Sequence, residues 1–317
     1  MNKLRLTLCS LFVFALPLVV GVAAHAAVSR TYVAMSGSDA NSCATPSDPC
    51  LTFQGAHGKT SAGGEVIAIE SGTYGKLAIN RAISIIGAPG VHAEITSTGA
   101  NNAVTIQAPL SATVILRNLH LAGPNANKGV YLISGKSLIV ENCTITGFTN
   151  GIYVKNSSTA TFYLRNTNVD NSNEGVVLEP TGTDFNKPIA AFVDNCRFRN
   201  YFKGFVAAGK YSMVTIRDSV FEGRSKDPAV TYGGIVASPN SAGTTRIMAE
   251  NNLVSNNYLA IGTTTDGVAF ISISQNVIYH NQLGVFVCCL SKMITMGNNR
   301  FEDNNDDGSF NLSSPLK

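Results

Sequence analysis

The chain has 317 residues and a formal net charge of +3, with 14% charged and 44% apolar residues. So few charges, together with 29 glycines and no tryptophan, favour many short strands joined by tight turns over a helical protein. No basic patch indicates a nucleic-acid partner, and no basic amphipathic helix indicates binding to a membrane surface.

Residues 1–26 have the pattern of an export signal. Lys3 and Arg5 precede an apolar run that Pro17 interrupts, and Ala24-His25-Ala26 fits the rule of small residues at a cleavage site. The alternative is a membrane anchor, but a spanning helix needs ~20 apolar residues and this run is shorter. We therefore expect cleavage after Ala26 and a secreted or periplasmic mature chain without a membrane span.

Residues 27–62 are expected to form an N-terminal cap with a local disulfide. Cys43 and Cys50 lie in a short polar loop, and this spacing favours a disulfide in an oxidising compartment. A metal site is the alternative, but it would need two more ligands nearby, and only His57 is close.

A short amphipathic helix is expected within this cap. Asp48 is placed to be its N-cap, Pro49 suits the first helical position, and Leu51, Phe53 and Ala56 follow as its apolar residues. Such a helix would cover the open end of the fold that follows it.

A polar residue recurs in one sequence context at intervals of about 24 residues within residues 63–310. Apolar residues stand two and four positions before it, and spacing by two marks one face of a strand. The first such pair is Val114/Leu116 and the last is Ile294/Met296. The recurring residues are Asn118, Asn142, Asn166, Asn195, Asp218, Asn251, Gln275 and Asn298.

A second strand follows in each segment, with apolar pairs running from Val130/Leu132 to Val285/Val287. One coil cannot cover its own inward residues, whereas neighbouring coils at ~4.8 Å bury them. The sequence therefore predicts an all-β solenoid, a single-stranded parallel β-helix with three strands per coil, followed by a C-terminal tail at 311–317. The recurring polar residues would mark one bend and point inward as a structural amide ladder.

Directly before each predicted bend stands an outward residue whose charge alternates in sign from coil to coil. Neighbouring coils lie ~5 Å apart, so each cation would lie between anions of the adjacent coils. Exposed ion pairs stabilise a fold only slightly, and the alternation would mainly fix the register between coils. We interpret this charge ladder as structural, because a catalytic acid would need an unpaired or shifted carboxyl group. Its members are Arg117, Glu141, Arg165, Asp194, Arg217 and Glu250.

These features together resemble a known group of proteins. The coil with three strands, its Asn bend and its period are similar to those of the pectin-lyase-like superfamily of right-handed β-helices. More narrowly, the chain resembles secreted bacterial right-handed parallel β-helix repeat-containing proteins through Tyr32, Cys43, Cys50, Thr52-Phe53-Gln54, Gly63-Gly64-Glu65 and Gly72-Thr73-Tyr74-Gly75. The resemblance covers nearly all of the mature chain and implies a right-handed β-helix, but it implies no particular activity.

The resemblance also implies that a substrate would lie along the outer face of the second strand. The central outward residues there are Tyr131, Tyr153, Val177, Val206, Val236, Gly262 and Phe286, and none is charged. This face shows neither the paired aspartates and Gly-His-Gly of polygalacturonase-like enzymes nor the calcium-binding acids and basic residue of pectate-lyase-like enzymes. General acid–base catalysis needs titratable groups near the substrate, so the face disfavours an enzyme, no cofactor is expected, and calcium is unsupported.

Three loops border this face, namely residues 179–188, 222–233 and 238–246. Long loops on a rigid scaffold often carry function, although insertions are also simply tolerated there. We hypothesise a groove floored by Val177, Val206 and Val236 that binds an extended glycan. Its predicted lining is Tyr153, Asp184, Lys187, Arg224, Lys226, Asp227 and Tyr232.

Two functions follow from this sequence. The first is a non-catalytic protein that binds polysaccharide or serves as an envelope or extracellular scaffold, and the alternative is a polysaccharide lyase or glycoside hydrolase with an atypical site in the insertion loops. The acidic segment 302–308 could bind calcium, but it lacks the terminal glutamate of an EF-hand loop. The adjacent Cys288 and Cys289 are expected to be thiols, because a bridge between neighbours would be strained.

Overall fold

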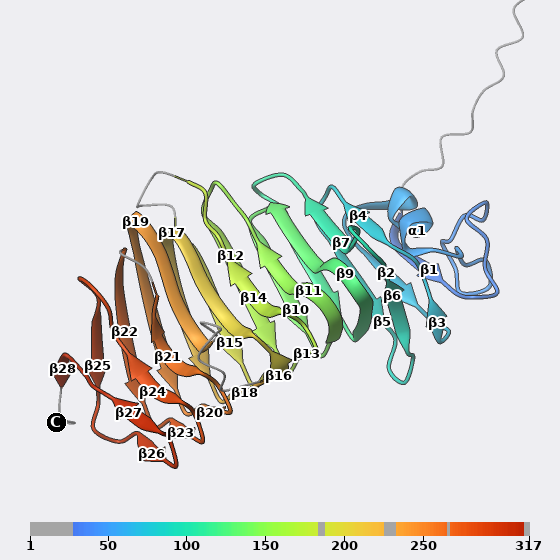
Figure 1. Cartoon of the computed structure of the whole chain (residues 1–317). Helices are drawn as coiled ribbons and strands as arrows, with labels where there is room; N and C mark the ends of the chain where they lie inside the picture. The colour runs from blue at the N-terminus through green and yellow to red at the C-terminus, as the bar shows by residue number, and fades with distance from the viewer. Residues whose placement is uncertain (1–27, 183–187, 225–232, 265–266, 314–317) are drawn as a thin grey trace, which may run out of the picture.

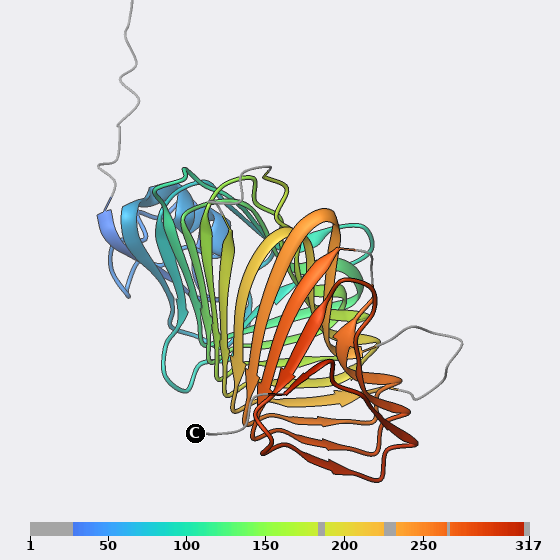
Figure 2. The same cartoon turned by 90° about the vertical axis from the view of Figure 1, so that its left-hand side faces the viewer.

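The chain folds as one long stack of parallel strands. The computed structural model describes residues 28–182, 188–224, 233–264 and 267–313, so the expected export signal lies outside the described residues. Strands pair in parallel with the coils before and after them. The coils follow one another along the long axis, with the last ones at the end opposite the N-terminal helix (Figures 1 and 2). Each coil contributes to three faces, which we name A, B and C.

Face A carries the first strand of each coil, and its central strands are bonded in register, as at Val114, Leu138 and Phe162. Its members are β1 (Val28–Val33), β2 (Thr60–Ala68), β5 (Ile83–Gly87), β8 (Thr113–Arg117), β10 (Ser137–Glu141), β12 (Ala160–Arg165), β15 (Ile189–Asp194), the second halves of β17 (Lys203–Arg217) and β19 (Gly233–Glu250), β22 (Val268–Ser274), β25 (Lys292–Thr295) and β28 (Leu312–Ser313).

Face B carries the short strand that follows each bend. Its members are β3 (Gly72–Thr73), β6 (Ala93–Thr96), the first halves of β9 (Leu119–Ser134) and β11 (Thr144–Val154), β13 (Asn168–Asp170), β16 (Arg197–Tyr201), β18 (Val220–Gly223), β20 (Leu253–Ser255), β23 (Val277–Tyr279) and β26 (Arg300–Glu302).

Face C carries the second predicted strand of each coil. Its members are β4 (Leu77–Ile79), β7 (Asn102–Gln107), the second halves of β9 and β11, β14 (Glu174–Leu178), the first halves of β17 and β19, β21 (Leu259–Thr263), β24 (Leu283–Phe286) and β27 (Asp306–Gly308). Four strands thus run on from one face to the next, β9 and β11 from B to C and β17 and β19 from C to A.

The core lies between the faces and is built from alternate residues of each strand. Val114 and Leu116 are fully buried, while Ile115 between them points outward. The last coil departs from the prediction, because Met293 and Thr295 align with Ile271 and Ile273. The predicted inward pair Ile294/Met296 is therefore wrong by one residue.

The recurring polar residues do stack at one corner, but their side chains do not point inward as predicted. Seven of them have φ between 48° and 55°, the left-handed conformation that asparagine and aspartate tolerate best. The seven are Asn118, Asn142, Asn166, Asn195, Asp218, Asn251 and Gln275. At the eighth position the left-handed residue is Gly297, with φ of 78°, and not Asn298.

The buried column at this bend is formed by the next residue of each coil. Cys143, Thr167, Cys196, Ser219, Asn252 and Asn276 are between 0% and 2% exposed. In this column the backbone N–H donates to the side chain one coil further on at five residues, as from Ser219 to Asn252 Oδ1 at 3.1 Å, the other donors being Cys143, Cys196, Asn252 and Asn276. The predicted inward ladder is therefore displaced by one residue, because the recurrence of asparagine marks the backbone conformation of the bend.

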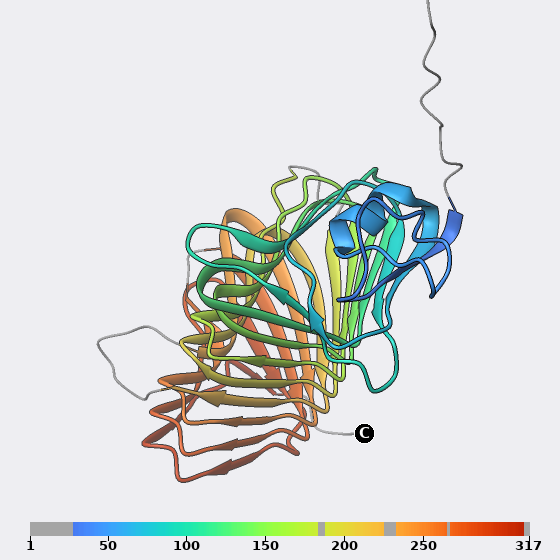
Figure 3. The ribbon, with the colours of Figure 1, turned by 90° about the vertical axis from the view of Figure 1, so that its right-hand side faces the viewer.

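A short helix, α1 (Phe53–Lys59), closes the N-terminal end of the stack (Figure 3). Phe53 is fully buried and packs against Tyr74 with ring centroids 4.9 Å apart. The predicted disulfide between Cys43 and Cys50 is present in the preceding loop. Within the described ranges, no helix is long and apolar enough to span a membrane.

The helix begins later than the sequence predicts. Its N-cap is Thr52, whose side chain accepts a hydrogen bond from the Gly55 N–H at 2.9 Å. Asp48 instead accepts hydrogen bonds from the backbone N–H and the hydroxyl of Ser42. The predicted start at Asp48 and Pro49 is wrong, because this aspartate caps a turn of the disulfide loop.

The parallel stack extends beyond the expected limits of 63 and 310. β1 already pairs with β2, and β28 pairs with β25. The predicted loop 238–246 is wrong as well, because these residues belong to β19. The extra residues enter as a register shift opposite Gly209 and Tyr211 of β17, which is how a strand accommodates an insertion.

Candidate functional site

Most of the predicted groove lining lies outside the described residues. The residues concerned are Asp184, Lys187, Lys226, Asp227 and Tyr232. Arg224 is described, and its Nε donates to Asn200 Oδ1 at 3.0 Å while its guanidinium group lies 4.3 Å from the Phe202 ring centroid. Tyr153 contacts Tyr131 and Lys128 of the preceding coil. The structure therefore does not bring Arg224 and Tyr153 together.

The predicted floor of the groove is not open. Val177, Val206 and Val236 stack in register on face C. Their exposed fractions are only 5%, 5% and 3%. These three positions therefore expose little apolar surface to a ligand, although Val236 lines a hollow of about 230 Å³ on face C together with Leu259 and Phe286.

A lysine between two tyrosines lies on face C in the preceding coils. Tyr131 of β9 and Tyr153 of β11 are register partners, and their rings meet edge to face with centroids 5.6 Å apart. The Lys128 Nζ atom lies 5.2 Å from the Tyr131 ring centroid and 5.0 Å from that of Tyr153. All three side chains are half-buried, so the ammonium group is partly withdrawn from water against two aromatic faces.

The surroundings of Lys128 lower the pKa of its side chain. Burial and the positive charge of Lys155 lower the pKa of Lys128, while the charge of Glu179 opposes this effect. Lys155 directly follows β11 and Glu179 directly follows β14, at the same end of face C. A lowered pKa increases the fraction of a lysine side chain that is neutral, and only the neutral amine can accept a proton.

Charged side chains continue from Lys128 along the same edge of face C. Asn150, Glu174 and Lys203 occupy the aligned positions of the next coils. The Asn150 amide donates to Glu174 Oε2 at 2.7 Å, and Lys203 Nζ lies 3.0 Å from Glu174 Oε1. The expectation that this face lacks titratable groups is therefore wrong, because they flank the central column of residues.

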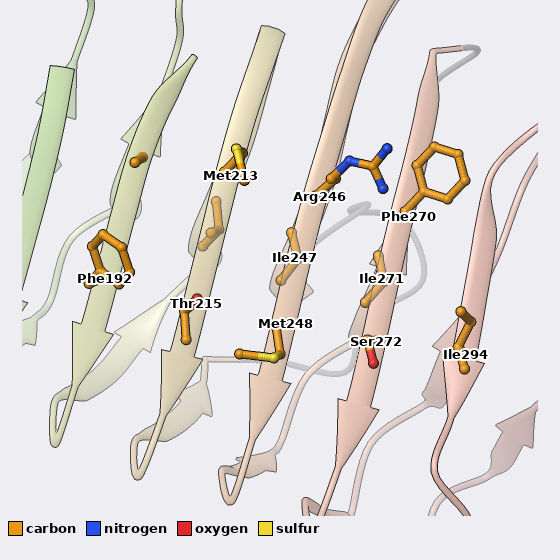
Figure 4. A pocket seen from close by; sticks show the side chains of 12 residues that line it. Phe192, Met213, Thr215, Arg246, Ile247, Met248, Phe270, Ile271, Ser272 and Ile294 are labelled. Carbon is orange, nitrogen blue, oxygen red and sulfur yellow. The ribbon is translucent and has the colours of Figure 1, made fainter. Parts of the chain in front are cut away.

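Face A carries a separate hollow of about 400 Å³ that spans β15, β17, β19, β22 and β25 (Figure 4). Phe192, Met213 and Met248 on it are 40%, 53% and 46% exposed. The guanidinium group of Arg246 lies 4.6 Å from the Phe270 ring centroid. Since Arg246 is the one charged residue of this lining, the hollow suits an apolar group and offers no acid–base pair.

The predicted charge ladder borders the hollow on face A. Asp194 and Arg217 form an ion pair of 2.7 Å, and Arg117 pairs with Glu141. Arg165 lies over the aromatic ring of its own strand at 5.2 Å. These contacts agree with a structural role for the ladder.

The acidic segment 302–308 is engaged within the last coils. Asp303 lies 2.9 Å from His280, and Asn304 accepts a hydrogen bond from the Asn281 backbone N–H. Calcium needs six to eight oxygen ligands, and these two side chains already serve the bend.

Four of the described cysteines lie outside the disulfide, and two of them, Cys143 and Cys196, are buried and unsuited to act as nucleophiles. Burial raises the pKa of the Cys143 and Cys196 thiols to about 12, which keeps them protonated. Cys288 and Cys289 are thiols, as the sequence predicts, with their sulfur atoms 2.8 Å apart.

Comparison with known families supports the architecture. A family model described as right handed beta helix region matches residues 79–221 and 150–315. The chain belongs to the right-handed β-helix family. No curated protein sequence matches the chain.

Solved structures of carbohydrate-active enzymes share the fold of this β-helix protein at low sequence identity. The pectate lyase Pel9A is 14% identical, with 92% of this chain and 80% of the other covered and a TM-score of 0.58. An alginate lyase from Paenibacillus sp. str. FPU-7 is 13% identical, with coverages of 90% and 100% and a TM-score of 0.55. The GH136 lacto-N-biosidase from Eubacterium ramulus is 14% identical, with coverages of 91% and 67% and a TM-score of 0.54. These similarities show the fold alone, a right-handed β-helix that this chain shares with the three enzymes.

Proposed function

We propose that this chain cleaves an acidic polysaccharide by β-elimination on face C, at the cluster of Lys128, Tyr131 and Tyr153. The observation that carries the proposal is the Lys128 ammonium group, which lies over two tyrosine rings and has a lowered pKa. A pectate lyase and an alginate lyase share the fold, which favours a substrate that contains uronate. The proposal keeps the enzyme alternative raised by the sequence but moves its site away from the insertion loops.

The chemistry requires a base near C5 of the sugar and an acid near the glycosidic oxygen that departs from C4. Elimination removes the proton at C5 of a uronate, breaks the bond between C4 and the glycosidic oxygen, and leaves a C4=C5 double bond. The neutral amine of Lys128 accepts the C5 proton, and a hydroxyl group of Tyr131 or Tyr153 donates a proton to the departing oxygen. Such general acid–base catalysis contributes roughly 10²–10⁴-fold in rate.

The substrate carboxylate needs a positive charge near it, because neutralising this group makes the C5 proton more acidic. Lys155 supplies this charge on the same face, and its influence on the pKa of Lys128 reflects their proximity. On the edge of face C that carries Lys128, Lys203 and Glu174 form an ion pair. The charge of Glu174 is thereby compensated, so this edge does not repel an acidic polysaccharide.

Calcium does not fit this cluster. The acids near Lys128 are Glu174, which already accepts from Asn150 and pairs with Lys203, and Glu179. These offer too few free oxygen atoms for a cation that prefers six to eight. The proposal therefore assigns the reaction to side chains alone.

The test follows products of the exported protein on polygalacturonate, alginate, rhamnogalacturonan and a neutral xylan. We expect ultraviolet-absorbing unsaturated products from at least one acidic polymer, and a kcat at least ~100-fold lower for Lys128→Ala. The matched control is Lys292→Ala, which changes an exposed lysine on face A and should leave kcat unchanged. Unsaturated product from the wild type with undiminished kcat in Lys128→Ala would refute the site.

Two other outcomes would overturn the reaction type. Reducing ends without unsaturated products would indicate hydrolysis, and binding without any product would indicate the non-catalytic glycan protein considered from the sequence. We also propose a secreted or periplasmic location, where such polymers are accessible. Mass spectrometry of the exported chain tests this location, with an N-terminus at residue 27 expected.

A further inference from the structure

Two histidines and one glutamate converge on face B, apart from the lysine–tyrosine cluster of face C. Glu94 of β6 and His120 of β9 are register partners in adjacent coils. Parallel pairing sets their backbones one strand spacing apart, about 4.8 Å. His92 stands two residues before Glu94 and therefore projects from the same side of the strand. The fold itself thus brings these three side chains together.

The three groups point at one another. His92 Nε2 lies 3.3 Å and His120 Nδ1 lies 3.2 Å from the same Glu94 oxygen, Oε2. The two imidazole rings are 4.7 Å apart between centroids. One ligand atom from each residue lies within 4.8 Å of the other two.

We propose that His92, Glu94 and His120 form a binding site for a borderline divalent cation, of which Zn²⁺ is the best match. Imidazole nitrogen and carboxylate oxygen are ligands that zinc prefers, at bond lengths of about 2.0–2.2 Å. In a tetrahedron of such bonds, two ligands lie about 3.3 Å apart. Both separations from Glu94 Oε2 already have this length.

One rotation completes the geometry. The two histidine nitrogens have to approach each other, and the His92 side chain is 59% exposed and free of core packing. Glu94 and His120 are more firmly placed, with 22% and 27% of their side chains exposed. A small rotation of the His92 ring therefore closes the site without a change in the backbone.

The surroundings orient the glutamate in the way expected around a metal ligand. The Thr73 hydroxyl group donates to Glu94 Oε1 at 3.3 Å, which leaves Oε2 directed at the histidines. Partners that fix a ligand in this way support metal binding. Three protein ligands leave a fourth position of the tetrahedron for water or a ligand group, and the exposed His92 places it on the solvent side.

The nature of the donors distinguishes this site from a calcium site. Calcium selects oxygen ligands, whereas two of the three ligands here are nitrogen. The site is independent of the proposed elimination reaction, because it shares no residue with the cluster around Lys128. Failure of either proposal leaves the other untouched.

The experiment is a calorimetric titration of chelator-treated, untagged protein with Zn²⁺. Cys288→Ser and Cys289→Ser are introduced together in every sample, so that these thiols do not bind the metal. We expect one Zn²⁺ per chain, a raised Tm, and no displacement by millimolar Ca²⁺. His92→Ala and Glu94→Gln should each weaken binding by at least ~10-fold, since each removes a direct ligand.

The matched control is His280→Ala. His280 also lies beside a carboxylate, 2.9 Å from Asp303, but it has no second histidine, and its loss should leave Zn²⁺ affinity unchanged. Because His92 is mostly exposed, its substitution does not threaten the fold, and a far-ultraviolet spectrum like that of the wild type verifies this. Absence of Zn²⁺ binding, or equal affinity in His92→Ala and wild type, would overturn the proposal.

Discussion

At the scale of single residues, the side-chain amides of the buried bend column satisfy the backbone of neighbouring coils. Asn276 Nδ2 donates to the Ala249 carbonyl at 2.9 Å, and its Oδ1 accepts from the Asn252 backbone N–H at 3.0 Å. Its own backbone N–H donates to Asn299 Oδ1 at 2.9 Å. An apolar residue at this position would leave buried groups of two coils without partners.

Asn276→Ala is therefore expected to lower the free energy of unfolding by about 2–5 kcal/mol, because each unsatisfied buried group costs ~1–3 kcal/mol. Urea denaturation followed by far-ultraviolet circular dichroism measures this loss. The matched control is the neighbouring Gln275→Ala, whose side chain is exposed and whose loss should cost less than about 1 kcal/mol. Equal losses in the two variants would show that the exposed column, and not the buried one, stabilises the bend.

Single residues also show how much of the bend and of the candidate site could be predicted from the sequence. A recurring asparagine correctly locates the corner. Asparagine is favoured there because the backbone has a positive φ, whichever way its side chain points, so the pattern cannot say which neighbouring residue points inward. The sequence includes Tyr153 among the candidate residues because it lies in the central outward column of face C. The sequence does not place Lys128 beside it, because Lys128 lies three residues before Tyr131 across a glycine, where strict alternation no longer assigns faces.

At the scale of the strands, alternation predicts the core wherever the repeat keeps its length. It gives the buried pairs of face A from Val114/Leu116 to Ile271/Ile273. It fails in the last coil, where one extra residue within the bend, between Thr295 and Arg300, places the asparagine one position late relative to the strand that carries Met293. It also fails in β19, where inserted residues remain within a strand. Both failures arise because an insertion can be absorbed by a bulge as easily as by a loop.

The helix α1 carries a buried histidine, His57, that makes the stability of the folded protein depend on pH. His57 is 2% exposed, and its Nε2 atom has no hydrogen-bond partner among the residues that the structure describes. Burial, with a smaller effect of the Arg81 charge, lowers the pKa of His57 from 6.5 to about 4. The folded protein therefore keeps this ring neutral at pH values where the unfolded chain protonates it.

The sign of the resulting pH dependence follows from the lowered pKa. The full stability is present above pH 6.5 and is lost as the pH falls from 6.5 towards 4, because the unfolded state binds a proton that the folded state does not. The loss amounts to about 3 kcal/mol by pH 4. His57→Gln should flatten the Tm profile in this window, while His280→Gln should not, and a slope that persists in His57→Gln would contradict the assignment.

At the scale of the whole molecule, a solenoid has two ends whose inward residues no further coil covers. In this chain α1 covers the first coil, and Phe53 is the buried residue that joins the two through Tyr74. An uncovered end presents both apolar surface and strand edges, which favour association between chains. We therefore expect the helix to hinder association between chains at this end of the stack, in addition to stabilising the first coil.

Phe53→Asp tests this role, because a buried carboxylate would displace α1 from the first coil. We expect a lower Tm and association that increases with protein concentration, measured by sedimentation velocity against the wild type. Leu51→Asp is the control, since Leu51 lies in the same segment but is 39% exposed and its substitution leaves the packing intact. If Phe53→Asp sedimented like the wild type at every concentration, the edges of the first coil would have to be protected by the disulfide loop and β1 rather than by the helix.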